Sequence, residues 1–246
     1  MKPSLNNKNI LLTGATSGIG KSLLLKMDEE FNNSKFFLIV RDVKKFKKFS
    51  NSLKNEYELI EFDLKKILNI DLINEQINFE TIDIVINNAG YALTRQPGKI
   101  RNREFIDLIN VNLVNVSILT NEFINKNIEN DSKKVLVNVG SIAGFFPNFT
   151  DPYYSSTKSF VNNLTLSLNK NIKNKNIKIK LFVPGLTHTE FFEKSRYTLS
   201  HKFPRLLGQT AEEASSYLFT NLFNKKTMII PRFINKVLVF ILRILY

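Results

Sequence analysis

Seven short apolar runs alternate with longer amphipathic stretches, and this alternation limits the possible folds more than any other feature of the sequence. The apolar runs predict strands at residues 9–13, 35–40, 57–62, 82–86, 134–139, 177–183 and 228–230. The stretches between them predict helices that end near residue 31, cover 43–54, 68–77, 103–127 and 152–173, and begin again at residue 210. Strands that alternate with helices at this spacing indicate a parallel sheet covered by helices on both faces.

The chain has 246 residues and contains no evident linker, low-complexity tract or internal repeat. We therefore expect one α/β domain over residues 1–246, built on a doubly wound parallel sheet of the Rossmann type with about seven strands. Ligands of such sheets bind beyond the carboxyl ends of the strands. The residues that follow each predicted strand are thus the first candidates for a functional site.

A glycine-rich turn follows the first predicted strand. Residues 13–20 read TGATSGIG and come directly before a predicted helix. Glycines let the backbone turn tightly and approach a pyrophosphate, and the helix N-terminus offers free N–H groups and a positive dipole end. The turn therefore predicts a dinucleotide site, with a tight turn that binds nothing as the alternative.

The end of the second predicted strand indicates which dinucleotide would bind. An acidic residue about 20 positions beyond the last glycine would hydrogen-bond the adenosine ribose of NAD. Val40 and Arg41 stand there instead, and a guanidinium suits the 2′-phosphate of NADP. Asp42 comes next and would weaken the local positive field. We predict a preference for NADP(H) over NAD(H); an ordinary exposed loop arginine is the alternative.

Further polar residues follow later strands. The sequence NNAG at 87–90 follows the fourth predicted strand, and Ser141 follows the fifth. Residues four apart share a face of a helix, so Lys158 would lie over Tyr154, and Tyr153 would pair with Thr157. Of the two adjacent tyrosines, only Tyr154 would then have an ammonium group beside it.

Together these pieces resemble the short-chain dehydrogenase/reductase family. The matching residues occur in the family's order between about residues 9 and 190: TGATSGIG at 13–20, Asp63, NNAG at 87–90, Asn112, Ser141, Tyr154, Lys158, Pro184 and Gly185. The spacing of the glycines is similar to that of the short form of the family. It favours oxidation and reduction of carbonyls and alcohols over sugar-nucleotide epimerisation.

The resemblance implies catalytic roles for four of these residues. Tyr154 would give a proton to the carbonyl oxygen of a ketone or aldehyde as hydride reaches its carbon. Ser141 would hold that oxygen, and Asn112 would hold a water in a proton relay. Lys158 would hold the nicotinamide ribose. Its ammonium and the positive nicotinamide of the oxidised cofactor would together lower the pKa of Tyr154 from the ordinary value of ~10.

The resemblance also implies a cofactor-binding set. Besides Arg41, Tyr154 and Lys158, it comprises residues at the ends of four predicted strands: Thr13, Gly14, Ser17, Gly18, Ile19, Gly20, Asp63, Leu64, Asn87, Ala89, Gly90, Pro184, Gly185, Thr187 and Thr189. Family members carry a threonine shortly after the Pro-Gly pair. Thr187 and Thr189 both suit that place, and the sequence does not rank them.

The family's substrate loop would span residues 187–209. Nine apolar residues in this loop and after Ser141 could line an apolar pocket, with core or subunit contacts as the alternative: Phe145, Phe146, Phe149, Phe191, Phe192, Tyr197, Phe203, Leu206 and Leu207. Such a pocket would suit a lipophilic substrate, such as a long-chain acyl or steroid-like compound. The resemblance further implies a homodimer or homotetramer formed through the helices near 103–127 and 152–173.

Composition bears on the cellular setting. The chain has no cysteine, which fits a reducing compartment, and its two histidines form no ligand cluster, so we expect no metal site. The N-terminal MKPSLNNKNI lacks the apolar core of a signal peptide, and no run of about 20 apolar residues is present. We therefore expect a cytoplasmic protein.

Charge and the C-terminal tail raise the question of peripheral membrane contact. The formal net charge is +13. Lysines scattered over solvated faces account for it, and a nucleic-acid or anionic-membrane partner is the alternative. No basic motif interleaved with aromatic residues supports nucleic-acid recognition. The apolar tail at 232–246 could be a buried helix, a dimer contact or an in-plane membrane anchor, and its pattern favours packing against protein.

Three classes of function therefore compete. The first is an NADP-dependent oxidoreductase that interconverts a carbonyl and an alcohol on a lipophilic substrate. The second is a catalytically silent NADP-binding regulatory or scaffold protein, which the presence of Ser141, Tyr154 and Lys158 disfavours. The third is a basic protein associated with membrane surfaces, for which the net charge is the only motive.

Overall fold

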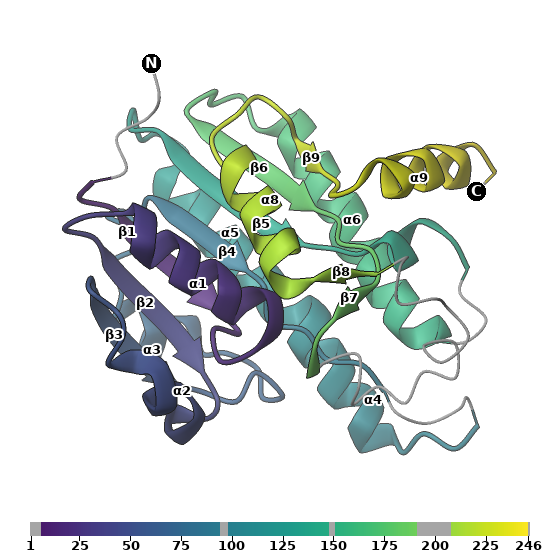
Figure 1. Ribbon diagram of the computed structural model, residues 1–246, viewed down its shortest axis with the longest axis horizontal. Helices are drawn as coiled ribbons and strands as arrows, with labels where there is room; N and C mark the ends of the chain where they lie inside the picture. The colour runs from purple at the N-terminus through teal and green to yellow at the C-terminus, as the bar shows by residue number, and fades with distance from the viewer. Residues whose placement is uncertain (1–5, 94–97, 148–150, 191–207, 246) are drawn as a thin grey trace.

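The computed structural model describes residues 6–93, 98–147, 151–190 and 208–245. A seven-stranded sheet lies at its centre, and all neighbouring strands are parallel, in the order β3-β2-β1-β4-β5-β6-β9 (Figure 1). The strands are β1 (Asn9–Thr13), β2 (Lys35–Val40), β3 (Glu56–Glu61), β4 (Ile84–Asn87), β5 (Lys134–Val139), β6 (Ile177–Phe182) and β9 (Met228–Ile229). The predicted doubly wound α/β fold is confirmed.

Helices cover both faces of this sheet. On one face, α1 (Gly18–Glu30), α2 (Val43–Ser50) and α8 (Ala211–Asn221) pack against alternate strand residues such as Ile10 and Leu12. On the other face, α3 (Ile70–Asn74), α5 (Asn115–Asn127) and α6 (Pro152–Asn171) pack against the residues between them, such as Leu11. Because both faces are buried, central strands such as β2 and β4 appear in the sequence as largely apolar runs.

The helix predicted over 103–127 is not a single α-helix. It consists of α4 (Asn102–Ile109), a π-helical turn η1 (Asn110–Val114) and α5. Asn110 and Asn112 lie buried in the π turn, and their amides bond the main chain of Lys65 and Tyr91. Apolar periodicity does not register such a local change of pitch, and π turns occur often at functional sites.

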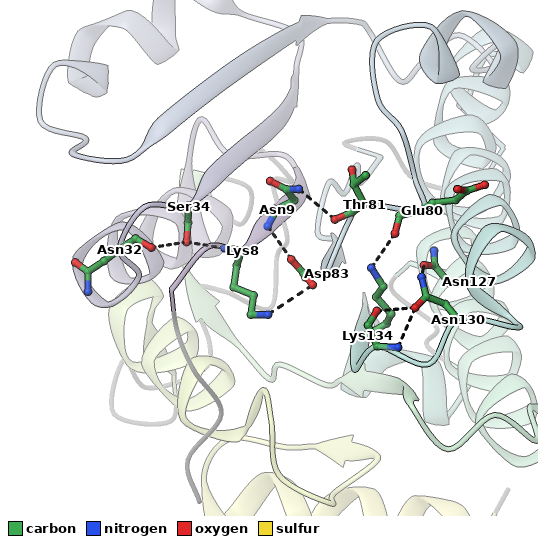
Figure 2. Close-up of polar contacts among 11 residues, drawn as sticks. Lys8, Asn9, Asn32, Ser34, Glu80, Thr81, Asp83, Asn127, Asn130 and Lys134 are labelled. Atoms are coloured by element: carbon green, nitrogen blue, oxygen red, sulfur yellow. Dashed lines mark hydrogen bonds and ion pairs between the residues drawn. The ribbon is translucent and has the colours of Figure 1, made fainter.

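The amino ends of the central strands are tied together by polar contacts (Figure 2). Asp83 accepts a hydrogen bond from the Asn9 amide at 3.0 Å and lies 3.6 Å from the Lys8 ammonium. The buried Lys134 donates to the Glu80 carbonyl at 2.9 Å, and burial lowers its pKa. These polar groups are satisfied by one another, so the contacts at the amino ends of the strands stabilise the fold.

The C-terminal helix α9 (Phe233–Leu245) follows β9 and extends outward from the rest of the protein (Figure 1, yellow). Val239 is buried against Ile142, Leu181 and Val183. Most of the other apolar side chains of α9 are exposed, so the predicted packing against protein holds for one face only. Within the ranges described above, no helix is both long enough and apolar enough to cross a membrane.

Candidate active site

A cavity of about 850 Å³ opens at the carboxyl ends of the strands. This volume lies in the upper part of the range for ligand pockets, ~300–1,000 Å³. Most of the predicted site residues line it: Gly14, Ser17, Gly18, Ile19, Gly20, Arg41, Asp63, Leu64, Ala89, Gly90, Ser141, Tyr154, Lys158, Pro184, Gly185, Thr187 and Thr189. The fold thus brings residues from along most of the chain to one cavity.

The glycine turn forms one wall of this cavity. Gly14 and Gly18 have φ angles of 72° and 53°, a left-handed conformation that favours glycine. A Cβ atom on Gly14 would lie 2.9 Å from the Cα of Ala89, so the turn also requires the missing side chain. Ser17 precedes α1 without capping it, and the first turn of α1 contains no acid. The wall therefore presents a hydroxyl and a helix N-terminus suited to a phosphate group.

Thr13 supports this wall from behind. It is buried and does not line the cavity. Its hydroxyl oxygen accepts hydrogen bonds from the amides of Asn88 and Ala89 at 3.0 and 2.9 Å. Thr13 therefore joins the end of β1 to the end of β4, and its placement differs from the predicted direct contact with cofactor.

The placement of Asn87 also differs from the prediction. Its amide donates to Thr120 and Asn138 in the buried layer beneath α5. Asn88 lines the cavity instead, and donates to the carbonyls of Thr13 and Gly14. Side chains alternate along a strand, so the burial of Val85 under α5 already places Asn87, two residues later, on that face.

Cationic groups gather at the end of the cavity nearest β2 and α2. Arg41 and Lys45 both line it. The Asp42 carboxylate accepts a hydrogen bond from the Lys45 amide at 2.8 Å, so it caps α2. The Lys45 ammonium contacts both carboxylate oxygens of Glu190, at 2.8 and 2.7 Å. Sequence reasoning missed Lys45, because nothing in the run of lysines at 44–48 distinguishes the one that faces the cavity.

The helix α6 places Lys158 beside Tyr154, as the spacing predicts. The Lys158 ammonium lies 5.8 Å from the centre of the Tyr154 ring and donates to the Val139 carbonyl at 2.8 Å. Tyr153 instead packs its ring edge-on against Phe105, with ring centres 5.3 Å apart. Only Tyr154 of the two tyrosines lines the cavity.

Burial controls the protonation of this pair. It lowers the pKa of Lys158 to about 8. It also raises the pKa of Tyr154 above its ordinary value, and a hydrogen bond with the Ser141 side chain opposes this only in part. The expected lowering of the Tyr154 pKa is therefore not found for the protein alone, because desolvation outweighs the hydrogen bond with Ser141. At neutral pH Tyr154 is a neutral phenol beside an ammonium.

Asp151 begins α6 and was not among the predicted site residues. Its carboxylate accepts a hydrogen bond from the Tyr154 amide at 2.9 Å, which caps the helix. Burial raises the pKa of Asp151 to about 6. When ionised, this carboxylate adds to the elevation of the Tyr154 pKa. Asp151 is thus a positioning residue for the first turn of α6.

Asn112 is fully buried in the π turn and does not line the cavity. Its oxygen accepts from the Tyr91 amide at 2.7 Å, and its amide donates to the Tyr91 carbonyl and the Thr157 hydroxyl. The Thr157 hydroxyl in turn donates to the Tyr154 carbonyl at 2.8 Å. The side chain therefore connects the loop after β4 to the catalytic helix, and the predicted water relay stays a prediction.

The two candidate threonines differ in their contacts. Thr187 begins the short strand β7 (Thr187–His188), which pairs with β8 (Gln209–Thr210). Its hydroxyl donates to the Gly185 carbonyl and accepts from the Gln209 amide. Thr189 lies beside the glycine turn, so that a Cβ on Gly18 would come within 3.1 Å of its methyl group. Both line the cavity.

The remaining cavity wall is largely apolar. Its residues come from the segments after β5 and β6 and from α9: Ile142, Ala143, Phe146, Leu186, Ile234, Asn235 and Leu238. Phe145 packs instead in the core beside Leu181 and Val183. The predicted wall residues Phe149, Phe191, Phe192, Tyr197, Phe203, Leu206 and Leu207 lie outside the described residues. The contribution of α9 was not predicted from the sequence, because it depends on the direction in which the chain leaves β9 and on the packing of α9 beside the cavity.

No cluster of three or more histidine, aspartate or glutamate side chains suited to a metal occurs in the described part of the chain.

Comparison with known proteins agrees with this geometry. The family described as short chain dehydrogenase matches residues 8–200. The NADP-dependent 3-hydroxy acid dehydrogenase of Schizosaccharomyces pombe is 32% identical over 198 residues, which cover 76% of this chain and 74% of that protein.

Solved structures share the fold. A short-chain dehydrogenase from Sphingobium yanoikuyae in complex with NADPH superposes with a TM-score of 0.80 at 23% identity, over 92% of this chain and 88% of that one. The bulky-bulky ketone specific alcohol dehydrogenase from Comamonas testosteroni superposes with a TM-score of 0.75 at 23% identity, over 91% and 86%.

Proposed function

Because the chain belongs to the short-chain dehydrogenase family and is an NAD(P)-dependent oxidoreductase, we propose that it interconverts a ketone or aldehyde and an alcohol with NADP(H). The observation that carries this proposal is one cavity that holds the glycine turn together with Ser141, Tyr154 and Lys158. A silent binding protein would not need the phenol, the ammonium and the serine hydroxyl on the same cavity.

The residues of the chain would divide the work of carbonyl reduction. When bound, the nicotinamide supplies the hydride to the carbonyl carbon. Tyr154, neutral at physiological pH because burial raises its pKa, would donate its proton to the carbonyl oxygen. Ser141 would hold the same oxygen by a hydrogen bond. Lys158 would bind the nicotinamide ribose and stabilise the phenolate as the proton leaves.

The cavity wall suits the dinucleotide. The glycine turn lacks the side chains that would keep a pyrophosphate away, and Ser17 and Thr189 lie beside it. Arg41 and Lys45 would bind a 2′-phosphate, although Asp42 also lines the cavity; its carboxylate accepts a hydrogen bond from the Lys45 amide and so caps α2. The NADP dependence of the S. pombe relative supports the same preference.

We propose a lipophilic substrate, because the part of the cavity wall that comes from the segment after β5 and from α9 is formed mainly by apolar residues such as Ile142, Phe146 and Leu238. An apolar wall favours a hydrocarbon chain over a charged group. A 3-hydroxy acid is the second candidate, and the identity of 32% to the S. pombe enzyme favours it. Its carboxylate would require a cation near Ser141, and Lys158 is the cation that lines that part of the described cavity.

We also propose self-association into a homodimer or homotetramer. Phe105, Ile106 and Phe160 leave large apolar surfaces exposed on α4 and α6, where a second copy of the chain would cover them. Light scattering during gel filtration would show a mass of two or four chains; a monomer at micromolar concentration would contradict this proposal.

The test of substrate and cofactor is consumption of NADPH and NADH, followed by absorbance. The substrates would be ketones and aldehydes of increasing chain length, with short 3-keto acids in parallel. We expect turnover with NADPH and a kcat/KM that rises with chain length by ~3–4-fold per methylene buried. A higher kcat/KM for the keto acids than for the ketones and aldehydes would favour a 3-hydroxy acid as the substrate. No turnover with any substrate would contradict the proposed activity.

A further inference from the structure

The helix α9 leaves an unusual amount of apolar surface exposed. Eight of its large apolar side chains are between 41% and 78% exposed: Phe233, Ile234, Val237, Leu238, Phe240, Ile241, Ile244 and Leu245. Val239 is the one residue of α9 that is buried. A helix that is apolar on nearly every side is ordinarily covered on every side, and contiguous exposed apolar patches mark interaction surfaces.

The helical repeat divides α9 into four stripes. One stripe packs against the protein and contains Asn235, Val239 and Leu242. Two adjacent stripes on the far side are wholly apolar and exposed: Phe233, Val237, Phe240 and Ile244, then Ile234, Leu238, Ile241 and Leu245. The fourth stripe is basic, with Lys236 and Arg243, and lies between the protein-facing stripe and the first apolar one.

The charged side chains of the segment that contains this helix have one sign. The sequence has no Asp or Glu after Glu213, whereas Lys225, Lys226, Arg232, Lys236 and Arg243 follow it. Lys236 is exposed beside the Tyr217 ring, with its ammonium 5.5 Å from the ring centre. An apolar face bordered by lysine or arginine is typical of helices that lie in the plane of a membrane surface, where cations attract anionic headgroups.

From these stripes we infer that α9 docks on an anionic lipid surface, with its two apolar stripes between the headgroups and its basic stripe against them. A second copy of the chain fits this face less well, because an antiparallel two-fold contact through the apolar stripes would place the basic stripes of the two copies on the same side of the interface.

The docked helix would also deliver substrate. Ile234 and Leu238 belong to an exposed apolar stripe and line the cavity as well. The cavity wall therefore continues into the surface that faces the lipid, and a lipophilic carbonyl compound could pass from the membrane to Tyr154 without crossing water. This role in substrate delivery rests on the proposed function, whereas docking itself does not.

The test is binding of the full-length protein to phosphatidylcholine vesicles with and without phosphatidylglycerol, measured by co-sedimentation. We expect binding to the anionic vesicles only. The double variant Phe240→Ser/Ile244→Ser removes two apolar side chains that do not line the active-site cavity, and it should weaken binding by at least ~10-fold. The matched control, Ile67→Ser/Leu72→Ser, removes side chains that are 59% and 53% exposed elsewhere and should bind as the native protein does.

A second pair of variants tests the charge. Lys236→Gln/Arg243→Gln should weaken binding by ~10-fold and reduce its dependence on salt, whereas Lys47→Gln/Lys48→Gln on α2 should change it by less than ~3-fold. Turnover of a short, water-soluble ketone without vesicles reports separately on the proposed function. Vesicle binding that survives Phe240→Ser/Ile244→Ser would overturn the inference. So would a native dimer that this variant converts to monomer without any binding to vesicles, since the face would then belong to a second copy.

Discussion

At the scale of residues, one ion pair stands where the cofactor phosphate would bind. Lys45 contacts both oxygens of Glu190, and this carboxylate would compete with a 2′-phosphate for the ammonium. We predict that Lys45→Met and Arg41→Ala each weaken NADPH binding by ~10–100-fold and change NADH binding by less than ~3-fold, because each removes a charge-assisted hydrogen bond to the phosphate alone. Quenching or enhancement of cofactor fluorescence measures both affinities.

The partner of this lysine gives the opposite prediction. Glu190→Gln removes the competing carboxylate and its repulsion of the phosphate, so NADPH should bind several-fold more tightly while NADH binding stays unchanged. Lys44→Met, which removes an exposed neighbour that does not line the cavity, serves as the control. Equal effects of these substitutions on the two cofactors would show that neither Arg41 nor Lys45 reads the 2′-phosphate.

The buried lysine of the site predicts a pH dependence. Burial lowers the pKa of Lys158 to about 8 and raises that of Tyr154, so Lys158 is the first of the two to lose its proton as pH rises. We expect kcat/KM for NADPH, which reports groups of the free enzyme, to be level near pH 7 and to fall as pH rises through about 8. A profile level up to pH 10 would contradict an essential ammonium at Lys158.

At the scale of elements, Lys180 joins three segments. This β6 residue is almost fully buried, and its ammonium donates to the carbonyls of Asn221, Asn224 and Lys226 and to the Asn224 side chain. It thereby holds the end of α8 and the turn into β9, the strand from which α9 departs. Burial lowers its pKa to about 8.

Replacing this lysine should cost stability. Lys180→Met leaves four acceptors without their donor, and we predict a free energy of unfolding lower by about 2–4 kcal/mol. Lys178→Met on the same strand gives up one contact, with the Phe223 carbonyl, and should cost less than ~1 kcal/mol. Urea denaturation measures both, and equal losses would argue against a special role for Lys180.

Some helices and strands could be predicted from the sequence, and others could not. Central strands such as β2 and β4 were predictable because burial on both faces makes each a largely apolar run. The pair Tyr154 and Lys158 was predictable because four residues make about one helical turn. The π turn at Asn112 was not predictable, because the buried side-chain amides of this turn bond main-chain groups that are distant in the sequence. The partial exposure of α9 was not predictable either, because the pattern of apolar residues does not show which faces of a helix are covered.

In the whole molecule, the parallel arrangement of the strands places the functional residues together at the carboxyl ends of the strands. Their carboxyl ends bring the glycine turn, Ser141 and the residues after Pro184 to one cavity, whereas contacts such as that between Lys134 and Glu80 hold the opposite edge. The motifs therefore indicated most of the site in advance. Lys45 and Leu238 were not predicted, since each reaches the cavity through tertiary packing. Asn88 was also missed, although the alternation of side chains along β4 distinguishes it from Asn87.

The role of Tyr154 as the proton donor is tested by the turnover of Tyr154→Phe with NADPH, compared with the native protein and with Tyr153→Phe. Both substitutions remove one phenolic hydroxyl, but only Tyr154 lines the cavity beside Lys158. We predict that Tyr154→Phe lowers kcat by ~10²–10⁴ and leaves the affinity for NADPH within ~3-fold of the native value, while Tyr153→Phe keeps native turnover. Full turnover of Tyr154→Phe would contradict the assignment of the proton donor and, with it, the mechanism.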